Sequence, residues 1–406
     1  MEEELGLDSW VSYLFKKESR LFFVGVAIRH LAIGMIGIFE PIYIYLAFGK
    51  SLTYTMIFFA TSYGLFGLLA VFGGRIMAKF GIKKTILVSN LIFFVYYICL
   101  LFINKNAFLP AVAIILRSIG LTLFWPGFHT YFIRFTNKET RSVKLGQLEG
   151  IFFIVNILGP MIGGLLLTTM DYTVLFVIVL ITLSISMLPL LMSKERHEVY
   201  SDTYRGAWKR IFKNRKTSVA LSSEAVELST SEFLWPLFMF TIGLSYKIMG
   251  SITTIGFIVS AILSVYIGKL LLQKNRTKML AINSPFVALA WIIKSFVVGP
   301  LTALLSRIFY YIFKVSADVP FQSMMYDKAE LHEDHADEFI IYREIIMNFT
   351  RLIYYSCLAL IFFFVPNIRI AFAFATIASL GFFFMSKDNI KILKNGFRYF
   401  TFQKNR

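Results

Sequence analysis

Charged residues are scarce in this sequence. Only 16% of its 406 residues are charged, whereas an average soluble domain has about a quarter. Hydrophobic residues make up 57% of the chain, and the mean hydropathy is +0.69. This composition excludes a disordered chain and an ordinary soluble domain, and it indicates a membrane protein.

Cysteine and the common catalytic motifs are also nearly absent. The two cysteines, Cys99 and Cys357, lie inside apolar runs, which excludes a disulfide framework and a zinc site. The acidic segment 332–338 contains two histidines but has no second ligand set nearby, so we expect a solvated connection there. The chain has no HExxH, GxSxG or GxxxxGK[ST] sequence. We therefore expect no metal, no cofactor, no enzymatic activity and no ATP hydrolysis.

Long apolar runs are what the sequence does contain. About 20 residues are needed for a helix to cross roughly 30 Å of hydrocarbon, and lipid offers no partners to an open backbone. The pattern thus predicts an all-α polytopic membrane protein with twelve transmembrane helices. These runs are Leu21–Phe48, Leu52–Gly74, Thr85–Ile103, Ala107–Tyr131, Gln147–Thr168, Tyr172–Met192, Ser218–Gly243, Ile248–Leu272, Met279–Val298, Leu301–Met325, Phe339–Phe364 and Ile368–Met385.

Basic residues gather in alternate loops. Loops near residues 75–84, 134–144, 194–216 and 269–278 are rich in Lys and Arg, and the intervening loops are not. The positive-inside rule then predicts cytoplasmic termini in the cell (plasma or inner) membrane, with residues 1–20 as an amphipathic segment and 387–406 as a basic tail. Anionic lipid headgroups account for the formal charge of +17, so we expect no nucleic-acid partner.

The chain contains an internal repeat. Residues 73–90 align with residues 267–284 at an offset of 194, and the same offset takes Pro126 to Pro320. Pro41 and Pro236 agree to within one residue. The sequence therefore predicts two pseudo-symmetric six-helix bundles, 21–192 and 218–386, joined by a hydrophilic linker, 193–217.

Three motifs add a family resemblance. They are the loop Gly74-Arg75-Ile76-Met77-Ala78-Lys79-Phe80-Gly81-Ile82-Lys83, an intramembrane Arg117-x-x-Gly120, and Gly159-Pro160-x-x-Gly163-Gly164. With the twelve helices they make the chain similar to the major facilitator superfamily. The resemblance implies a monomeric secondary transporter that works by rocker-switch alternating access. The loop departs from the family pattern at Ala78, where an acidic residue is usual, so the gating role of that acid is not carried over.

The glycine-rich stretch in the fifth predicted helix bears on the direction of transport. Gly159 and Gly163 are spaced for close helix packing, Pro160 permits a bend, and Gly164 adds to the small surface. The stretch resembles the signature of proton-coupled antiporters, in which helix 5 faces helix 8. Helix packing without any bearing on transport direction is the alternative.

Ionisable residues inside apolar helices are functional candidates, because each costs at least about 2.5–3.5 kcal/mol to insert. We predict that a solute or a proton binds at eight of them. They are Arg29, His30, Glu40, Arg117, Glu224, Glu227, Lys314 and Asp318. Glu224 or Glu227 is the first choice for the proton carrier, followed by Asp318 and Glu40.

Structural alternatives stay open for these candidates. Arg29 could extend to the cytoplasmic surface instead. As counterparts in the repeat, Arg29 and Glu224 could form an ion pair or share a contact with the solute, and the alternative for Glu224 and Glu227 is that they lie in water near the cytoplasmic mouth. Lys314 and Asp318 could be a structural i, i+4 pair. Further polar residues in apolar runs are Asn156, Arg307 and Arg351, and we expect Lys294 to anchor a helix at the outer interface.

A second set of charges lies where the resemblance places the cytoplasmic gate. Arg75 and Glu344, and likewise Lys269 and Glu149, would form two latches between the halves. Arg343, which the repeat aligns with Glu149, and the loop residues Lys79, Gly81 and Lys83 belong to the same predicted gate. The alternative is that these are ordinary surface pairs.

These features predict proton-coupled export of a small polar or charged solute. The first alternative is a proton-coupled importer of a polar nutrient such as a sugar or an amino acid. A non-transporting membrane sensor or scaffold is a third, more remote class.

Overall fold

The computed structural model describes residues 17–135, 141–195, 197, 200, 203–271, 275–330 and 336–385, and no strand occurs among them. For description, we call the helices before the linker half one and those after it half two. Half one contains α2 (Lys17–Gly37), α3 (Glu40–Ala47), α4 (Leu52–Phe80), α5 (Ile82–Leu101), α6 (Leu109–Phe135), α7 (Arg141–Thr169) and α8 (Tyr172–Met192). After linker helix α9 (Tyr204–Lys213), half two contains α10 (Arg215–Ser229), the π-helix η1 (Thr230–Leu234), α11 (Trp235–Thr241), α12 (Tyr246–Leu270), α13 (Arg276–Lys294), α14 (Pro300–Glu330), α15 (Ala336–Phe364) and α16 (Arg369–Gly381).

Every predicted apolar run corresponds to one helix or one interrupted helix, so the predicted all-α twelve-helix fold is confirmed. Six of the described helices are long and apolar enough to span a membrane on their own. The pair α2 and α3, bent by 42°, passes the same test as one broken span. Helix α14 carries Arg307, Lys314 and Asp318 within its length, which lowers its hydropathy.

Proline interrupts the first helix of each half. Helix α2 ends at Gly37, and α3 restarts at Glu40 with Pro41 in its first turn. In half two, the N–H of Trp235 donates to the carbonyl of Thr230, five residues back, in the π-turn that precedes Pro236. Since proline has no N–H, Pro236 cannot bond the carbonyl of Glu232 in an α-helical pattern. The π-turn accommodates that break, and such turns occur frequently at functional sites.

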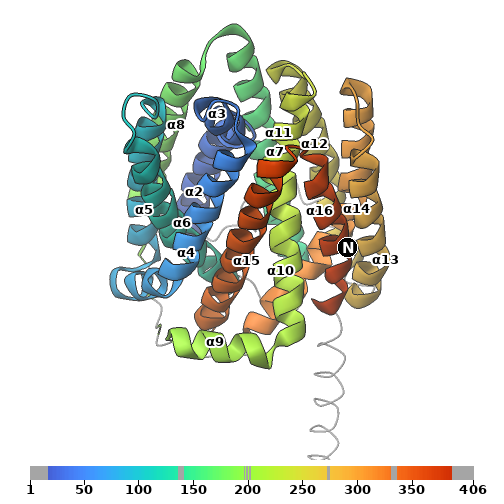
Figure 1. The fold of residues 1–406 in the computed structure, drawn as a ribbon. Helices are drawn as coiled ribbons and strands as arrows, with labels where there is room; N and C mark the ends of the chain where they lie inside the picture. The colour runs from blue at the N-terminus through green and yellow to red at the C-terminus, as the bar shows by residue number, and fades with distance from the viewer. Residues whose placement is uncertain are drawn as a thin grey trace, which may run out of the picture.

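The two halves meet along two helix pairs, α4 with α15 and α7 with α12 (Figure 1). A Cβ on Gly164 of α7 would lie 2.7 Å from the carbonyl oxygen of Tyr246 in α12. On the next face of α7, a Cβ on Gly163 would lie 2.0 Å from the carbonyl oxygen of Met35 in α2. A side chain at either position would therefore force the backbones apart. In this structure α7, the fifth spanning helix, therefore packs closely against α2 and against α12, the eighth.

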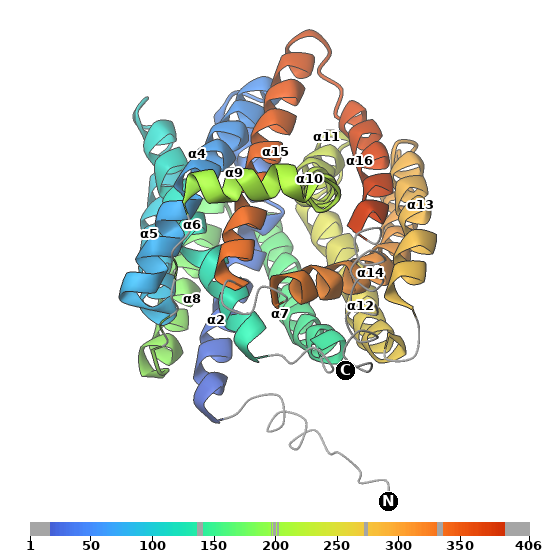
Figure 2. The same cartoon turned by 90° about the horizontal axis from the view of Figure 1, so that it is seen from below.

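Linker helix α9 lies across one end of the bundle, beneath α4 and α15 (Figures 1 and 2). Tyr204 donates to the carbonyl of Leu68 in α4, and Arg210 pairs with Glu338 in α15. Burial raises the pKa of the Tyr204 hydroxyl, so this donor keeps its proton at neutral pH. The linker therefore ties both halves together at the end that we call the linker end; the opposite end is the far end.

Candidate functional site

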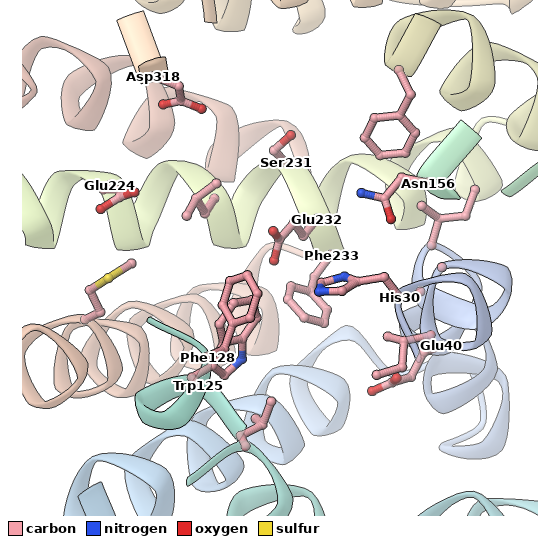
Figure 3. Close-up of a pocket in the computed structure, with 18 of the residues that line it drawn as sticks. His30, Glu40, Trp125, Phe128, Asn156, Glu224, Ser231, Glu232, Phe233 and Asp318 are labelled. Carbon is pink, nitrogen blue, oxygen red and sulfur yellow. The ribbon is translucent and has the colours of Figure 1, made fainter. Parts of the chain in front are cut away.

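A cavity of about 560 Å³ lies between the two halves. Its wall comes from α2, α3, α4, α5, α6 and α7 on one side and from α10, η1, α12, α14 and α15 on the other. Figure 3 shows Glu224, Ser231 and Glu232 on one wall, across from Trp125 and Phe128, with His30 and Glu40 farther along. The cavity thus joins segments that are far apart in sequence.

The two ends of this cavity differ. At the far end, aromatic side chains from both halves pack together: the rings of Phe39 and Tyr246 are 5.8 Å apart, and those of Tyr172 and Tyr246 are 6.0 Å apart. None of these three residues lines the cavity, which instead reaches His129 and Tyr326 near the linker end. The structure therefore has its cavity directed toward the linker end and is closed by aromatic packing at the far end.

In half one, the predicted residues Arg117 and Glu40 form a buried ion pair. Their Nε and Oε1 atoms are 3.1 Å apart, and the same carboxylate oxygen accepts a hydrogen bond of 2.9 Å from Tyr96. Arg117 also donates to the Tyr63 hydroxyl at 3.3 Å. Both charged residues line the cavity, so the pair is at once a helix–helix tie and part of the site.

Arg29 and His30 also line the cavity, but Arg29 does not extend to the surface. Its Nε donates to Asn90 at 2.8 Å, and its guanidinium carbon lies 3.5 Å from the centroid of the Phe124 ring. Arg29 and Glu224 do not form an ion pair in this conformation, because Asn90 and Phe124, both in half one, hold the arginine on its own side.

In half two, Glu227 and Lys314 lie at the centre of a buried network. Lys314 Nζ is 2.8 Å from Glu227 and 2.6 Å from Asp318, as the i, i+4 spacing predicted for the second contact. Glu227 accepts further hydrogen bonds from Tyr310 and Trp291 at 2.6 and 3.1 Å. Asp318 and Lys314 line the cavity, whereas Glu227 lies behind its wall with no exposed surface.

Lys294 lies within the protein, not at the outer interface. Its Nζ is 3.4, 3.7 and 4.9 Å from the ring centroids of Tyr310, Trp291 and Trp235, and the side chain is fully buried. The expectation of an interfacial anchor is wrong, because three aromatic rings solvate the ammonium group inside half two.

The polar groups at the linker end differ from the predicted latch. Glu344 is buried and lies 2.6 Å from Arg343 of its own helix, while Arg75 is exposed. A pair between Arg75 and Glu344 is thus absent from this conformation. His129 supplies the contact between halves instead: its ring nitrogens lie 2.7 Å from the Tyr326 hydroxyl and 3.2 Å from Arg343.

Glu224 joins the same polar region. It accepts a hydrogen bond from Gln322, and one of its oxygens is 4.0 Å from Arg343. It lines the cavity and is buried, so it does not stand in bulk water at the mouth.

The loop after α4, which carries the motif from Gly74 to Lys83, is held in place by contacts with the linker. Gly81 has a φ of +93°, and a Cβ there would lie 2.3 Å from Oε1 of Glu195. Glu195 accepts hydrogen bonds from the backbone N–H groups of Lys83 and Lys84 at 2.9 and 3.2 Å, and Lys83 Nζ donates to the Ser193 carbonyl at 2.7 Å. A linker carboxylate therefore caps the N-terminus of α5.

The second predicted latch involves a residue whose side chain lies outside the described ranges. Lys79 and Lys269 are exposed, and the Lys79 ammonium lies 5.2 Å from the ring of Phe80. The side chain of Glu149 lies outside the described residues. Its proposed contact with Lys269 stays a prediction.

Two residues gain importance that sequence reasoning did not give them. Glu232 lies in the π-turn, is exposed to the cavity, and has no hydrogen-bond or ion-pair partner among the described residues (Figure 3). Arg307 is buried on the cavity wall without a carboxylate partner in the described part of the chain. The proline four residues after Glu232 was the available signal for the first. For Arg307 there was no such signal, because the sequence does not show which buried cations have a carboxylate partner.

Within the described ranges, no three His, Cys, Asp or Glu side chains come together as metal ligands would. The cavity is lined by mixed charges and aromatic rings, a surface that can bind a small polar solute.

Comparison with known proteins agrees with this geometry. The chain is similar in structure to a fucose:proton symporter of E. coli, FucP, with a TM-score of 0.64 at 14% identity over 90% of this chain and 97% of that one. It is also similar to the human organic anion transporter MFSD10, with a TM-score of 0.68 at 10% identity over 91% and 98% of the two chains. No curated protein matches it in sequence. The family model of the Major Facilitator Superfamily matches residues 22–333, and the chain therefore belongs to this superfamily of membrane transporters.

Proposed function

We propose that this protein moves a small polar or charged solute across the cell membrane by rocker-switch alternating access, coupled to protons and in the direction of export. The observation that carries the proposal is the cavity between the halves with an unpaired carboxylate, Glu232, on its wall. In this reading the linker end is cytoplasmic, as the loop charges predict, and the cavity faces inward. The functional unit is a monomer in a bilayer with anionic headgroups.

Glu232 replaces the earlier candidates as the first choice for the proton carrier. Glu40 pairs with Arg117, and Glu227 and Asp318 share contacts with Lys314 at 2.8 and 2.6 Å. An ion pair favours the charged form of a carboxylate, whereas an unpaired carboxylate in a partly desolvated cavity exchanges its proton more readily. Glu224, which accepts from Gln322 and lies 4.0 Å from Arg343, is the next candidate.

The packing of α7 supports export. Gly164 and Pro160 of the antiporter-like stretch contact α12 of the other half at the far end of the cavity, so the stretch lies where alternating access must open and close. Proton-coupled uptake is the second candidate, because the same carboxylate and cavity serve a symporter.

One experiment tests transport, coupling and direction. Proteoliposomes that contain a pH-sensitive dye are challenged from outside with pools of sugars, amino acids, organic anions and organic cations. Antiport raises the luminal pH as solute enters, whereas symport lowers it. We expect a pool-dependent rise that is lost in Glu232→Gln, with solute exchange retained.

The matched control is Asp171→Asn. This change also converts a carboxylate to an amide, but Asp171 caps α8 outside the cavity, and asparagine caps a helix equally well. Normal proton movement is expected in this variant. Absence of both proton movement and labelled-solute exchange for every pool would contradict the proposed function, and a luminal pH fall would replace export by uptake.

A further inference from the structure

Arg307 is a buried cation that the described part of the protein leaves largely unpartnered. Its exposed fraction is 3%, and it lines the cavity between Tyr310 and Tyr311. One nitrogen, Nη2, donates to the Tyr311 hydroxyl at 2.8 Å. The other two, Nε and Nη1, have no acceptor among the described residues. Buried guanidinium N–H groups are normally hydrogen-bonded, so two open donors on a cavity wall point to a ligand.

The other cavity cations are better satisfied. Arg117, Lys314 and Arg343 each lie within 3.1 Å of a carboxylate oxygen. Arg29 donates to Asn90 and stacks on Phe124. Arg351 donates to Asn348 at 3.2 Å, and its guanidinium carbon lies 4.8 Å from the centroid of the Tyr63 ring. Arg307 has only a neutral hydroxyl, although an uncompensated buried charge is strongly destabilising.

The charge balance of the cavity depends on the protonation of Glu232. Among the described lining residues, six are Arg or Lys and five are Asp or Glu, and Glu227 behind the wall adds a sixth acid beside Lys314. Protonation of Glu232 would leave an excess of positive charge, so loading a proton and attracting an anion would act in the same sense.

The surroundings of Arg307 are suited to an organic group. Its guanidinium carbon is 4.6 and 5.8 Å from the ring centroids of Tyr311 and Tyr310, and Phe257 of α12 lines the cavity as well. Arginine binds carboxylates and phosphates through charge-assisted hydrogen bonds, and the aromatic rings can pack against an apolar body.

We propose that Arg307 binds the acidic group of the transported solute, which is therefore an organic anion with a carboxylate or phosphate group. This inference rests on the proposed transport function and adds the substrate class. A bound anion would complete the counter-charge that the protein itself does not provide at Arg307.

The test measures binding to the purified, full-length protein in detergent, through the shift of the unfolding temperature. The probes are aromatic and aliphatic monocarboxylates, phosphate monoesters, the uncharged methyl esters of the same carboxylates, organic cations, and chloride. We expect the acids to stabilise the wild type and their esters not to. Arg307→Gln should weaken binding about tenfold or more, as expected for the loss of charge-assisted hydrogen bonds, whereas Arg307→Lys should retain part of it.

Lys247→Gln is the control, because Lys247 is an exposed cation at the start of α12 and should bind the acids as the wild type does. The unfolding temperature without ligand reports whether each variant is folded. Carboxylates and phosphates compared side by side identify the acidic group. An effect given entirely by chloride would overturn the organic-anion inference.

Failure of this inference is distinguishable from failure of the transport proposal. If a neutral or cationic solute drives proton movement in proteoliposomes, equally in the wild type and in Arg307→Gln, then transport stands and the anion site is overturned.

Discussion

Two cavity arginines, Arg117 in half one and Arg307 in half two, have different surroundings. In half one, Arg117 lies 3.1 Å from Glu40 and donates to Tyr63. At the corresponding position of half two, 194 residues later, the chain has Tyr311, and the cation lies one turn earlier at Arg307. Arg307 donates to Tyr311 and has no carboxylate partner in the described ranges. Each half therefore has an arginine–tyrosine contact on the cavity wall, but only Arg117 also has a carboxylate partner among the described residues.

This difference separates two roles that a buried arginine can have. A paired arginine ties helices together, and its removal leaves an uncompensated carboxylate behind. An arginine with open donors on a cavity wall is available to a ligand. Glu232, the unpaired carboxylate of half two, also differs in position from Glu40: Glu40 directly precedes Pro41, whereas Glu232 lies four residues before Pro236, in the π-turn.

The largest effect should come from breaking the pair in half one. Glu40→Gln leaves Arg117 buried without its carboxylate, and we expect a loss of about 3–5 kcal/mol in the free energy of unfolding. Denaturation of the detergent-solubilised protein measures it. Glu232→Gln, the matched change at an unpaired carboxylate, should leave stability nearly unchanged. Equal losses in the two variants would contradict the distinction between the halves.

The next effect concerns the close packing of α7 against α2 in half one. Gly163→Ala places a Cβ 2.0 Å from the Met35 carbonyl oxygen, and overpacking of this kind costs about 1–3 kcal/mol. Thermal unfolding measures the loss. Gly37→Ala is the control, because a Cβ there meets no atom within 4 Å. A wild-type unfolding temperature for Gly163→Ala would argue against backbone contact between α7 and α2.

Tyr311→Glu places a carboxylate beside Arg307 and so makes its surroundings resemble those of Arg117. The new acid lies four residues after Arg307 on α14 and can neutralise it, as Glu40 neutralises Arg117. We expect affinity for an organic acid to fall about tenfold, which corresponds to about 1.4 kcal/mol, while the protein stays folded. Titration of the purified protein measures the affinity, and Tyr311→Phe is the control without the added charge. Unchanged affinity in Tyr311→Glu would show that the acid binds elsewhere.

The smallest effect concerns the caps of two helices that the repeat relates. Helix α5 is capped by Glu195 from the linker, whereas α13 is capped by its own neighbour, Asn275, which accepts from the Lys278 N–H at 3.3 Å. Each cap should contribute about 1 kcal/mol. Glu195→Ala should also free the linker from α5, which limited proteolysis between residues 193 and 217 would detect. Asn275→Ala should lower stability equally without that change in proteolysis, and identical cleavage patterns would refute the linker's role.

The sequence alone determined the architecture. Apolar runs of the length of a bilayer, the offset of 194 residues and the spacing of Gly159, Gly163 and Gly164 are local patterns, and each has one physical reading in a membrane. The same holds for the presence of charges such as Arg117 at membrane depth, since their insertion cost singles them out in any context. The contact between Lys314 and Asp318 could also be predicted from the sequence, because the two residues lie on one face of a single helix.

Only the tertiary structure decided which of these charged residues reach the cavity without being paired inside the protein. Glu227 lies behind the cavity wall, Lys294 in an aromatic cage and Glu344 beside Arg343, whereas Glu232 and Arg307 reach the cavity without carboxylate or ammonium partners among the described residues. Pairing depends on distances of 3–4 Å between helices that are remote in sequence, and a one-residue difference in helical phase changes the partner. No local pattern encodes that phase; it is set by how the two halves pack around proline breaks and glycine contacts.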